Sequence, residues 1–245
     1  MPIKKGDLIY IDYIGIVKES GEIFDTTIEE EAKKAGIYNE KQKYKPILVA
    51  VGRSWVVEGL DEALIGKEEN QYFEVEVPPE KGFGNRDVNK IVIYTRRKLL
   101  EAGIRGELRP GTVVTINGVP AIVRAASGGR YLLDFNPPLA GKTLIYKVWI
   151  RTICKTLDEK IRAIIERRSE KFAEKAKYKF DSEKKVLEIR LVGDSALDSE
   201  IQMAKKSVIE DIFELSPNIK EIRIVESFER SSGESSSKGK RVKSK

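Results

Sequence analysis

The chain has 245 residues, of which 40% are hydrophobic and 34% are charged, and its formal net charge at pH 7 is +6. This length predicts about two domains and the apolar content predicts a buried core, which excludes a wholly disordered chain. Histidine is absent and Cys154 is the single cysteine, which excludes His-based acid–base catalysis, an intramolecular disulfide and a His or Cys metal cluster.

The positive charge is concentrated in two segments. Residues 86–134 contain nine Lys and Arg against four Asp and Glu, and residues 230–245 contain six against one. The rest of the chain is close to neutral, unlike a uniformly basic nucleic-acid binder. No apolar run of about 18 residues and no apolar signal core are present, so we expect no membrane segment and a cytoplasmic protein. The high charge and the two methionines are typical of a thermophile.

The first 85 residues predict a strand-rich domain with one short helix. Alternating apolar residues predict a strand over 7–17, which a polar turn connects to a short extended segment at 23–25. A charged surface excursion follows over 29–45, then a strand over 46–51. Residues 59–65 predict a helix, with Gly66 as the residue that ends it. A strand over 71–77 ends at Pro78 and Pro79.

The composition changes from residue 85 onwards. We expect a strand over 90–94, a short basic helix over 95–102, and three strands over 112–116, 121–125 and 131–135 that are separated by glycine turns. Residues 86–134 therefore predict a small β-rich unit inserted into the first domain. The first domain resumes at 135 and ends in a long strand over 143–152.

The remaining residues predict a second α+β unit over 156–229. Thr156 and Glu159 have the spacing of a capping box, which predicts a helix from there to about Lys177. A strand over 185–192, a helix over 199–215 and a strand over 219–225 follow. The Ser-, Gly- and Lys-rich residues 230–245 predict a disordered basic tail. Cys154 lies in an apolar run, so we expect a buried apolar side chain.

Several motifs, read together, resemble one enzyme family. These are GEIFDTT at 21–27, VGRSWVVEGL at 51–60, PEKGFG at 79–84 and NPPLAGKTLIY at 136–146. In order and spacing they resemble the FKBP-type peptidyl-prolyl isomerases, and the interruption between the last two resembles the insert-in-flap domain of the SlyD branch. The extra C-terminal unit resembles the archaeal long form of that branch.

This resemblance implies an α+β fold in which an antiparallel sheet wraps on a short helix. The isomerase domain would comprise 1–85 plus 135–155, with the insertion at 86–134 and a C-terminal α+β domain at 156–229. It also implies rotation of X-Pro bonds, which breaks no bond and needs no nucleophile, metal or cofactor. Leu60 stands where many members have Trp, and Phe83 stands where they have Tyr.

The resemblance also assigns site residues. It implies catalytic roles for seven residues that line an apolar prolyl pocket: Tyr13, Phe24, Asp25, Val57, Leu60, Phe83 and Tyr146. Ile47 and Val56 would contact substrate beside them. In the insertion, unfolded chain would bind the apolar residues Ile91, Ile93, Tyr94 and Leu100.

Three functions from different classes stay open at this point. The first is a prolyl isomerase with chaperone activity, whose partners are proline-containing unfolded or nascent polypeptides. The second is a binding-only holdase, and the third is a ribosome- or RNA-associated factor that uses the basic insertion and tail. Intact pocket residues such as Tyr13 and Asp25 favour the first. The amphipathic helices after residue 156 add a homodimer as a further hypothesis.

Overall fold

The computed structural model describes residues 1–228, and the predicted tail at 230–245 lies outside them. The chain divides into two compact units, Met1–Ile153 and a second unit that starts at Cys154. Both are α+β, as predicted, and their sheets are antiparallel apart from one parallel strand pair. Within 1–228 no helix is both long and apolar enough to cross a membrane.

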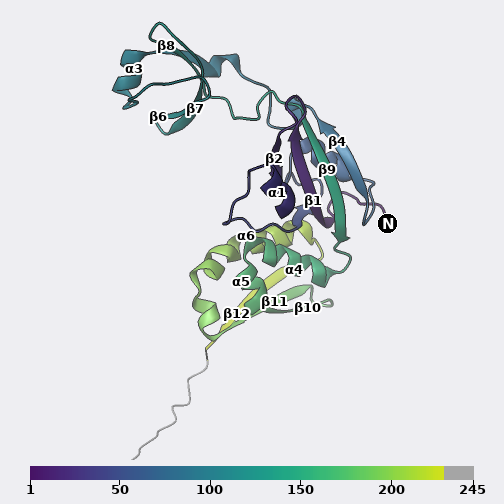
Figure 1. Cartoon of the computed structure of the whole chain (residues 1–245). Coiled ribbons are helices and arrows are strands. Elements are labelled where there is room, and N and C mark those ends of the chain that lie inside the picture. The colour runs from purple at the N-terminus through teal and green to yellow at the C-terminus, as the bar shows by residue number, and fades with distance from the viewer. Residues whose placement is uncertain (229–245) are drawn as a thin grey trace, which may run out of the picture. The chain divides into compact units, whose positions relative to one another are not determined.

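A five-stranded antiparallel sheet forms the centre of the first unit (Figure 1). Its strand order is β2-β1-β9-β4, and β3 pairs with the first half of β1. The strands are β1 (Leu8–Val17), β2 (Ile23–Thr26), β3 (Ile47–Ala50), β4 (Tyr72–Val77) and β9 (Leu144–Ile153). Because β9 follows the insertion and pairs with both β1 and β4, the sheet needs both halves of the interrupted sequence.

Helix α2 (Glu58–Leu64) packs against this sheet. Leu60 and Leu64 are buried in the apolar core that the strands contribute, and Gly66 follows the helix at a φ of +80°. This left-handed conformation suits glycine and ends the helix as predicted. Gly59 allows close approach, because a Cβ there would lie 2.7 Å from a methyl carbon of Val77 on β4. The excursion at 29–45 contains only the short helix α1 (Glu29–Lys34).

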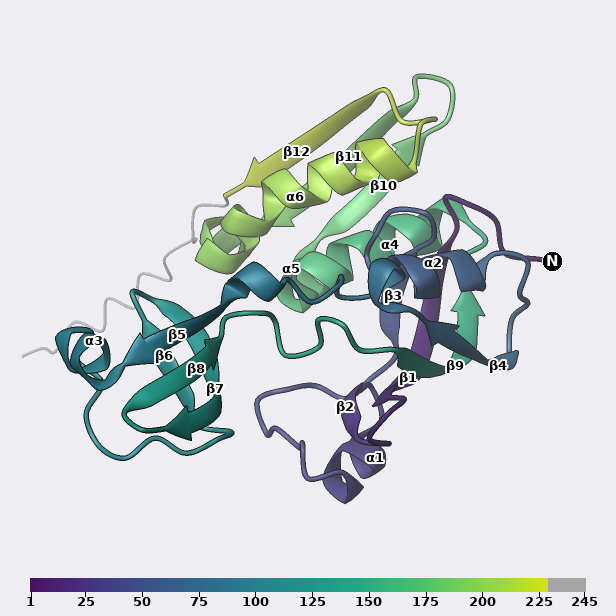
Figure 2. The same cartoon turned by 90° about the horizontal axis from the view of Figure 1, so that it is seen from above.

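The insertion has a sheet and a core of its own. The strand order is β5-β8-β7-β6, so that β5 and β6 are its edges (Figure 2). The elements of the insertion are a 3₁₀ turn at Val88–Lys90, β5 (Ile91–Thr95), α3 (Arg96–Glu101), β6 (Val113–Ile116), β7 (Val119–Ser127) and β8 (Arg130–Asp134). A further 3₁₀ turn at Pro79–Lys81 precedes the insertion. Its buried side chains, among them Leu99, Val123 and Leu133, form a cluster separate from the core of the first sheet.

The second unit has three helices over one face of a three-stranded sheet, order β10-β11-β12 (Figure 1). Leu187, Ile189 and Leu191 alternate on the covered face and are fully buried. The elements are α4 (Leu157–Arg168), α5 (Glu170–Lys175), β10 (Lys177–Asp181), β11 (Val186–Val192), a 3₁₀ turn at Gly193–Leu197, α6 (Ser199–Leu215) and β12 (Glu221–Ser227). The predicted capping box at Thr156 and Glu159 is formed.

One prediction in this unit is wrong. The helix expected to run from 156 to about Lys177 ends at Arg168 and restarts at Glu170, because Ser169 adopts an extended conformation. The Ser169 side chain caps the new helix by accepting a hydrogen bond from the Phe172 N–H at 3.1 Å. The strand β10 was missed, although Tyr178 and Phe180 alternate with polar residues in the manner of a half-buried strand.

Candidate active site

Four aromatic side chains from four segments meet on the first sheet. Tyr13 lies on β1, Phe24 on β2 and Tyr146 on β9, while Phe83 follows the 3₁₀ turn Pro79–Lys81. The ring centroids of Tyr13 and Tyr146 are 5.9 Å apart, and those of Phe24 and Tyr146 are 5.8 Å apart and perpendicular. Phe83 meets the Phe24 ring edge-on at 6.2 Å. Such edge contacts stabilise aromatic clusters and hold each ring in one orientation.

Exposure differs strongly across this cluster. Tyr146 is 4% exposed and forms the base of the cluster, whereas Phe83 is 42% exposed. Tyr13 and Phe24 are half-buried and pack against the core of the sheet. The cluster is therefore an apolar surface that is buried on the side of Tyr146 and open to solvent on the side of Phe83.

Asp25 is the charged group next to this surface. The Tyr13 hydroxyl donates a hydrogen bond of 2.5 Å to its Oδ2. Burial, followed by this hydrogen bond and the negative charge of Asp25, raises the pKa of Tyr13 well above its usual range. Burial and the same charge also raise the pKa of Tyr146. Both phenols are therefore neutral donors at physiological pH.

A polar network behind the sheet fixes the strand that carries Tyr13. The Tyr13 backbone N–H donates to Thr27 Oγ1 at 3.0 Å, and its carbonyl accepts from Thr26 Oγ1 at 2.8 Å. The Thr27 hydroxyl donates to Asp12 Oδ1 at 2.7 Å, and Arg151 Nε donates to the other oxygen of Asp12 at 2.6 Å. Because Thr26 and Thr27 directly follow Asp25, this network holds Tyr13 and Asp25 in register.

A β-bulge aims the Phe24 ring. Gly15 pairs with Asp25 and Ile16 pairs with Ile23, so Phe24 has no residue opposite it on β1. Bulges of this kind redirect a side chain beside functional sites. A Cβ at Gly15 would lie 2.6 Å from Cζ of Phe24, so the ring lies over the glycine. Gly15 was missed by sequence reasoning, and its only signal was a glycine inside an otherwise apolar alternating strand.

The entry to helix α2 supplies the floor of the site. Leu60 is 2% exposed, and half-buried Ile47, Val56 and Val57 pack against the same core. Val57 is the N-cap residue of α2, and its carbonyl accepts from the Leu60 N–H at 3.0 Å. Within residues 1–228, the Val57 N–H donates to no protein acceptor. It is therefore an available hydrogen-bond donor.

A buried carboxylate shapes the loop that leads to this floor. Asp61 is 6% exposed and accepts hydrogen bonds from the backbone N–H groups of Gly52 at 2.8 Å and Ser54 at 3.1 Å. The bond to Ser54 compensates for backbone strain, because Ser54 has a φ of +55°, whereas Gly52 adopts its φ of +78° without strain. Asp61 was also missed, since an acidic residue on a short helix gives no sign of burial.

A groove adjoins the aromatic cluster and shares Phe24 with it. Its apolar lining comes from the β1–β2 connection, the segment after α1 and the start of the NPPLAGK motif, and Lys34 and Lys142 stand among its polar residues. Its volume is about 680 Å³.

The four expected substrate residues of the insertion differ in exposure. Ile93 is 59% exposed and Leu100 is 48% exposed, whereas Ile91 is half-buried. Tyr94 is half-buried and packs against the core of the insertion, with its ring centroid 6.1 Å from that of Phe135. Tyr94 therefore contributes to the packing of the insertion, whereas Ile93 and Leu100 expose apolar surface to solvent.

The arrangement has the chemistry of binding and desolvation. It combines an apolar aromatic surface, one free backbone donor and a fixed carboxylate. Among residues 1–228 no group of three or more His, Cys, Asp or Glu is placed to hold a metal ion. A surface of this kind removes water from a polar group that binds against it.

Comparison with known proteins identifies the family of this chain. The model for FKBP-type peptidyl-prolyl cis-trans isomerases matches residues 1–100, and the model described as FKBP26_C-terminal matches residues 157–229. The chain is 37% identical over 151 residues to the short-type peptidyl-prolyl cis-trans isomerase of Methanocaldococcus jannaschii, an alignment that covers 62% of this chain and 94% of that protein.

Bacterial relatives are similar over shorter lengths. The SlyD isomerase of Treponema pallidum is 31% identical over 129 residues, covering 48% of this chain and 68% of its own length. The FKBP-type 16 kDa isomerase of Escherichia coli K12 is 28% identical over 116 residues, covering 46% and 78%. The chain therefore belongs to the FKBP-type peptidyl-prolyl cis-trans isomerases, and it is an enzyme that acts on proline-containing polypeptides.

Proposed function

We propose that the aromatic cluster is the prolyl pocket and that the insertion captures unfolded clients for it. Rotation about an X-Pro bond has a barrier of about 18–20 kcal/mol, because the twisted imide loses its resonance. An enzyme lowers this barrier by binding the twisted form better than the planar one. The pocket does so by holding the proline ring on Tyr146 and Leu60, with Phe24 and Phe83 as walls.

The polar groups of the pocket have separate roles. The Val57 N–H binds a carbonyl of the substrate next to the proline, and its position at the start of α2 fixes its direction. Asp25, held by the Tyr13 hydroxyl at 2.5 Å, lies beside the imide. Ile47 and Val56 extend the apolar contact on the same side. The single observation that carries the proposal is the convergence of Tyr13, Phe24 and Tyr146 around that carboxylate.

The exposed apolar surface of the insertion supports client capture. The insertion buries a complete core, yet several large apolar side chains stay exposed on it, among them Val88, Val92, Ile93, Leu100, Val113 and Val119. Its edge strands β5 and β6 each leave one side unpaired in the four-stranded sheet. An extended polypeptide can pair with such an edge through its main chain, and neighbouring apolar residues then contact its side chains.

Deletion of the insertion tests both parts of the proposal. Residues 87–133 are replaced by a short linker, and two rates are measured, on a proline-containing tetrapeptide and on a reduced, carboxymethylated ribonuclease whose refolding is limited by proline. We expect the tetrapeptide rate to be retained and the refolding rate to fall strongly. Equal losses on both substrates would contradict capture by the insertion. Refolding at the full rate without the insertion would also contradict it.

Point substitutions give a sharper version of this test. Ile93→Ser with Leu100→Ser removes exposed apolar surface from the insertion without touching its core. Leu197→Ser in the second unit is the matched control, because Leu197 is 68% exposed and lies outside the first unit. We expect weaker binding of permanently unfolded, carboxymethylated α-lactalbumin in the double variant and unchanged binding in the control.

The holdase alternative gives a different result in the same assays. A holdase would bind α-lactalbumin and suppress aggregation but would not accelerate tetrapeptide isomerisation.

Ribosome contact through the tail, a homodimer through the second unit and a cytoplasmic location stay predictions. The exposed Met203 and Phe213 on α6 are the apolar residues available to such a dimer.

A further inference from the structure

The insertion is joined to the first sheet by two linkers, and polar contacts tie these linkers together. The incoming linker runs from 84 to 90 and the outgoing linker from 134 to 141. At the end nearer the sheet, the Gly141 N–H donates to the Gly84 carbonyl at 2.8 Å. At the end nearer the insertion, the Phe135 N–H donates to the Lys90 carbonyl at 2.9 Å. A network of side chains lies between these two bonds.

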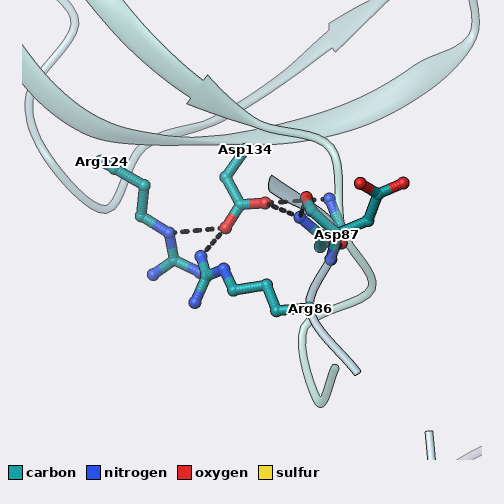
Figure 3. A network of polar contacts seen from close by, with 5 residues as sticks. Arg86, Asp87, Arg124 and Asp134 are labelled. Atoms are coloured by element: carbon teal, nitrogen blue, oxygen red, sulfur yellow. Dashed lines mark hydrogen bonds and ion pairs between the residues drawn. The ribbon is translucent and has the colours of Figure 1, made fainter. Parts of the chain in front are cut away.

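Asp134 is the centre of this network (Figure 3). It is the last residue of β8 and is 1% exposed. Its Oδ2 accepts from Arg124 Nε of β7 at 2.9 Å and forms an ion pair with Arg86 of the incoming linker. A buried carboxylate is costly unless it is paired, so two guanidinium partners explain how Asp134 is kept in the sheet.

Asn136 connects the two linkers directly. It is 8% exposed, and its Oδ1 accepts from the Asp87 N–H at 2.9 Å while its Nδ2 donates to the Asp87 carbonyl at 2.9 Å. The same Nδ2 also donates to Asp134 Oδ1 at 2.8 Å. We call Arg86, Asp87, Arg124, Asp134 and Asn136 the linker clamp.

The guanidinium groups of Arg86 and Arg124 both pair with one buried carboxylate, that of Asp134. Burial and the neighbouring charge of Arg86 both lower the pKa of the Arg124 guanidinium, since two cations face the same aspartate. With Arg86 replaced, the pair of Arg124 and Asp134 remains within the insertion and Asn136 still holds Asp87, so only the ion pair of Arg86 is lost. Arg86 can therefore be changed without opening the fold of the insertion.

We infer that the linker clamp keeps the two linkers short and stiff, and thereby sets how efficiently a chain captured by the insertion reaches the prolyl pocket. This inference rests on the proposed capture by the insertion. Arg86, Asp134 and Asn136 act as positioning residues, because none of them belongs to the pocket. The clamp matters only for substrates that bind both parts of the protein.

The expected size of the effect follows from linker length. With the clamp closed, the incoming linker is free only over about residues 85–86, and with both the Arg86 and the Asn136 contacts removed it is free to about residue 90. The effective concentration of a tethered partner falls roughly as the −3/2 power of linker length. A threefold longer linker therefore predicts a drop of about fivefold in kcat/KM for a protein substrate.

The test uses Arg86→Gln in the full-length chain, with Arg86→Lys as the conservative variant. Arg109→Gln is the matched control, since Arg109 lies on the insertion, is 78% exposed and pairs only with an exposed glutamate. Three quantities are measured: tetrapeptide isomerisation, binding of carboxymethylated α-lactalbumin, and catalysed refolding of the carboxymethylated ribonuclease. We expect the first two to be unchanged, and the third to fall in part in Arg86→Gln, to fall about fivefold in Arg86→Gln combined with Asn136→Ala, and to recover in Arg86→Lys.

Each other outcome overturns the inference in a recognisable way. Refolding at the wild-type rate in Arg86→Gln, and also in Arg86→Gln combined with Asn136→Ala, would show that the clamp does not affect transfer. Loss of α-lactalbumin binding in the single variant would mean that Arg86 merely stabilises the insertion. Failure of the proposed capture is distinguished separately, because it appears as full refolding activity after deletion of 87–133.

Discussion

Replacing Gly15 by alanine is expected to disable the pocket while the sheet stays intact. Gly15 lies near the C-terminal end of β1, between its partners Asp25 on β2 and Tyr146 on β9. Its conformation is open to any residue, so the only obstacle is space. The new Cβ would lie 2.6 Å from Cζ and 2.9 Å from Cε1 of Phe24. Carbon atoms in contact are normally about 3.5–4.0 Å apart.

The Phe24 ring therefore has to retreat by about 1 Å in Gly15→Ala. Overpacking of this kind costs about 1–3 kcal/mol of stability. A displacement of about 1 Å in a site can reduce the rate about 100-fold. We expect losses of both sizes, measured as the free energy of unfolding in urea and as kcat/KM on a tetrapeptide.

A second substitution separates the clash from other effects. Phe24→Leu in the Gly15→Ala background removes the ring that the new methyl group meets. Stability should then recover in part while activity stays low, which gives a non-additive double-mutant cycle. Wild-type kcat/KM in Gly15→Ala would refute the reasoning. Strictly additive stability changes would refute it as well.

Three other predictions concern the same unit and the start of the next. Because the pKa values of Tyr13 and Tyr146 are raised in the fold, their contribution to stability is complete below about pH 10 and is lost as the pH rises through the folded values. Ultraviolet titration should show two of the nine tyrosines ionising only on alkaline unfolding, and kcat/KM should be flat from about pH 6 to 9. Burial raises the pKa of Cys154 to about 11, so iodoacetamide should react roughly 100-fold more slowly with the folded than with the unfolded chain; equal rates would contradict the burial. Asp61→Ala should lower the free energy of unfolding by about 2–3 kcal/mol, because two N–H groups lose a charged acceptor; an unchanged urea midpoint would contradict this.

Local patterns were sufficient for most elements of this fold. The strands predicted over 7–17 and 143–152 match β1 and β9 to within one residue, and the alternation of apolar residues over 7–17 was the signal for the first of them. The capping box at Thr156 placed the start of α4, and Gly66 placed the end of α2. The single helix expected to about Lys177 was wrong because the capping hydrogen bond of Ser169 stabilises a break there.

The sequence by itself determined the fold class, the family and the residue types of the proposed pocket. Those follow from periodicity, from turn residues and from the order of short motifs such as IFDT and EGL. Only the tertiary structure decided how the residues meet: the bulge that sets Phe24 over Gly15, the burial of Asp61, and the clamp around Asp134. The physical reason is that each of these depends on contacts between strands and linkers far apart in the chain, and such contacts leave no local pattern.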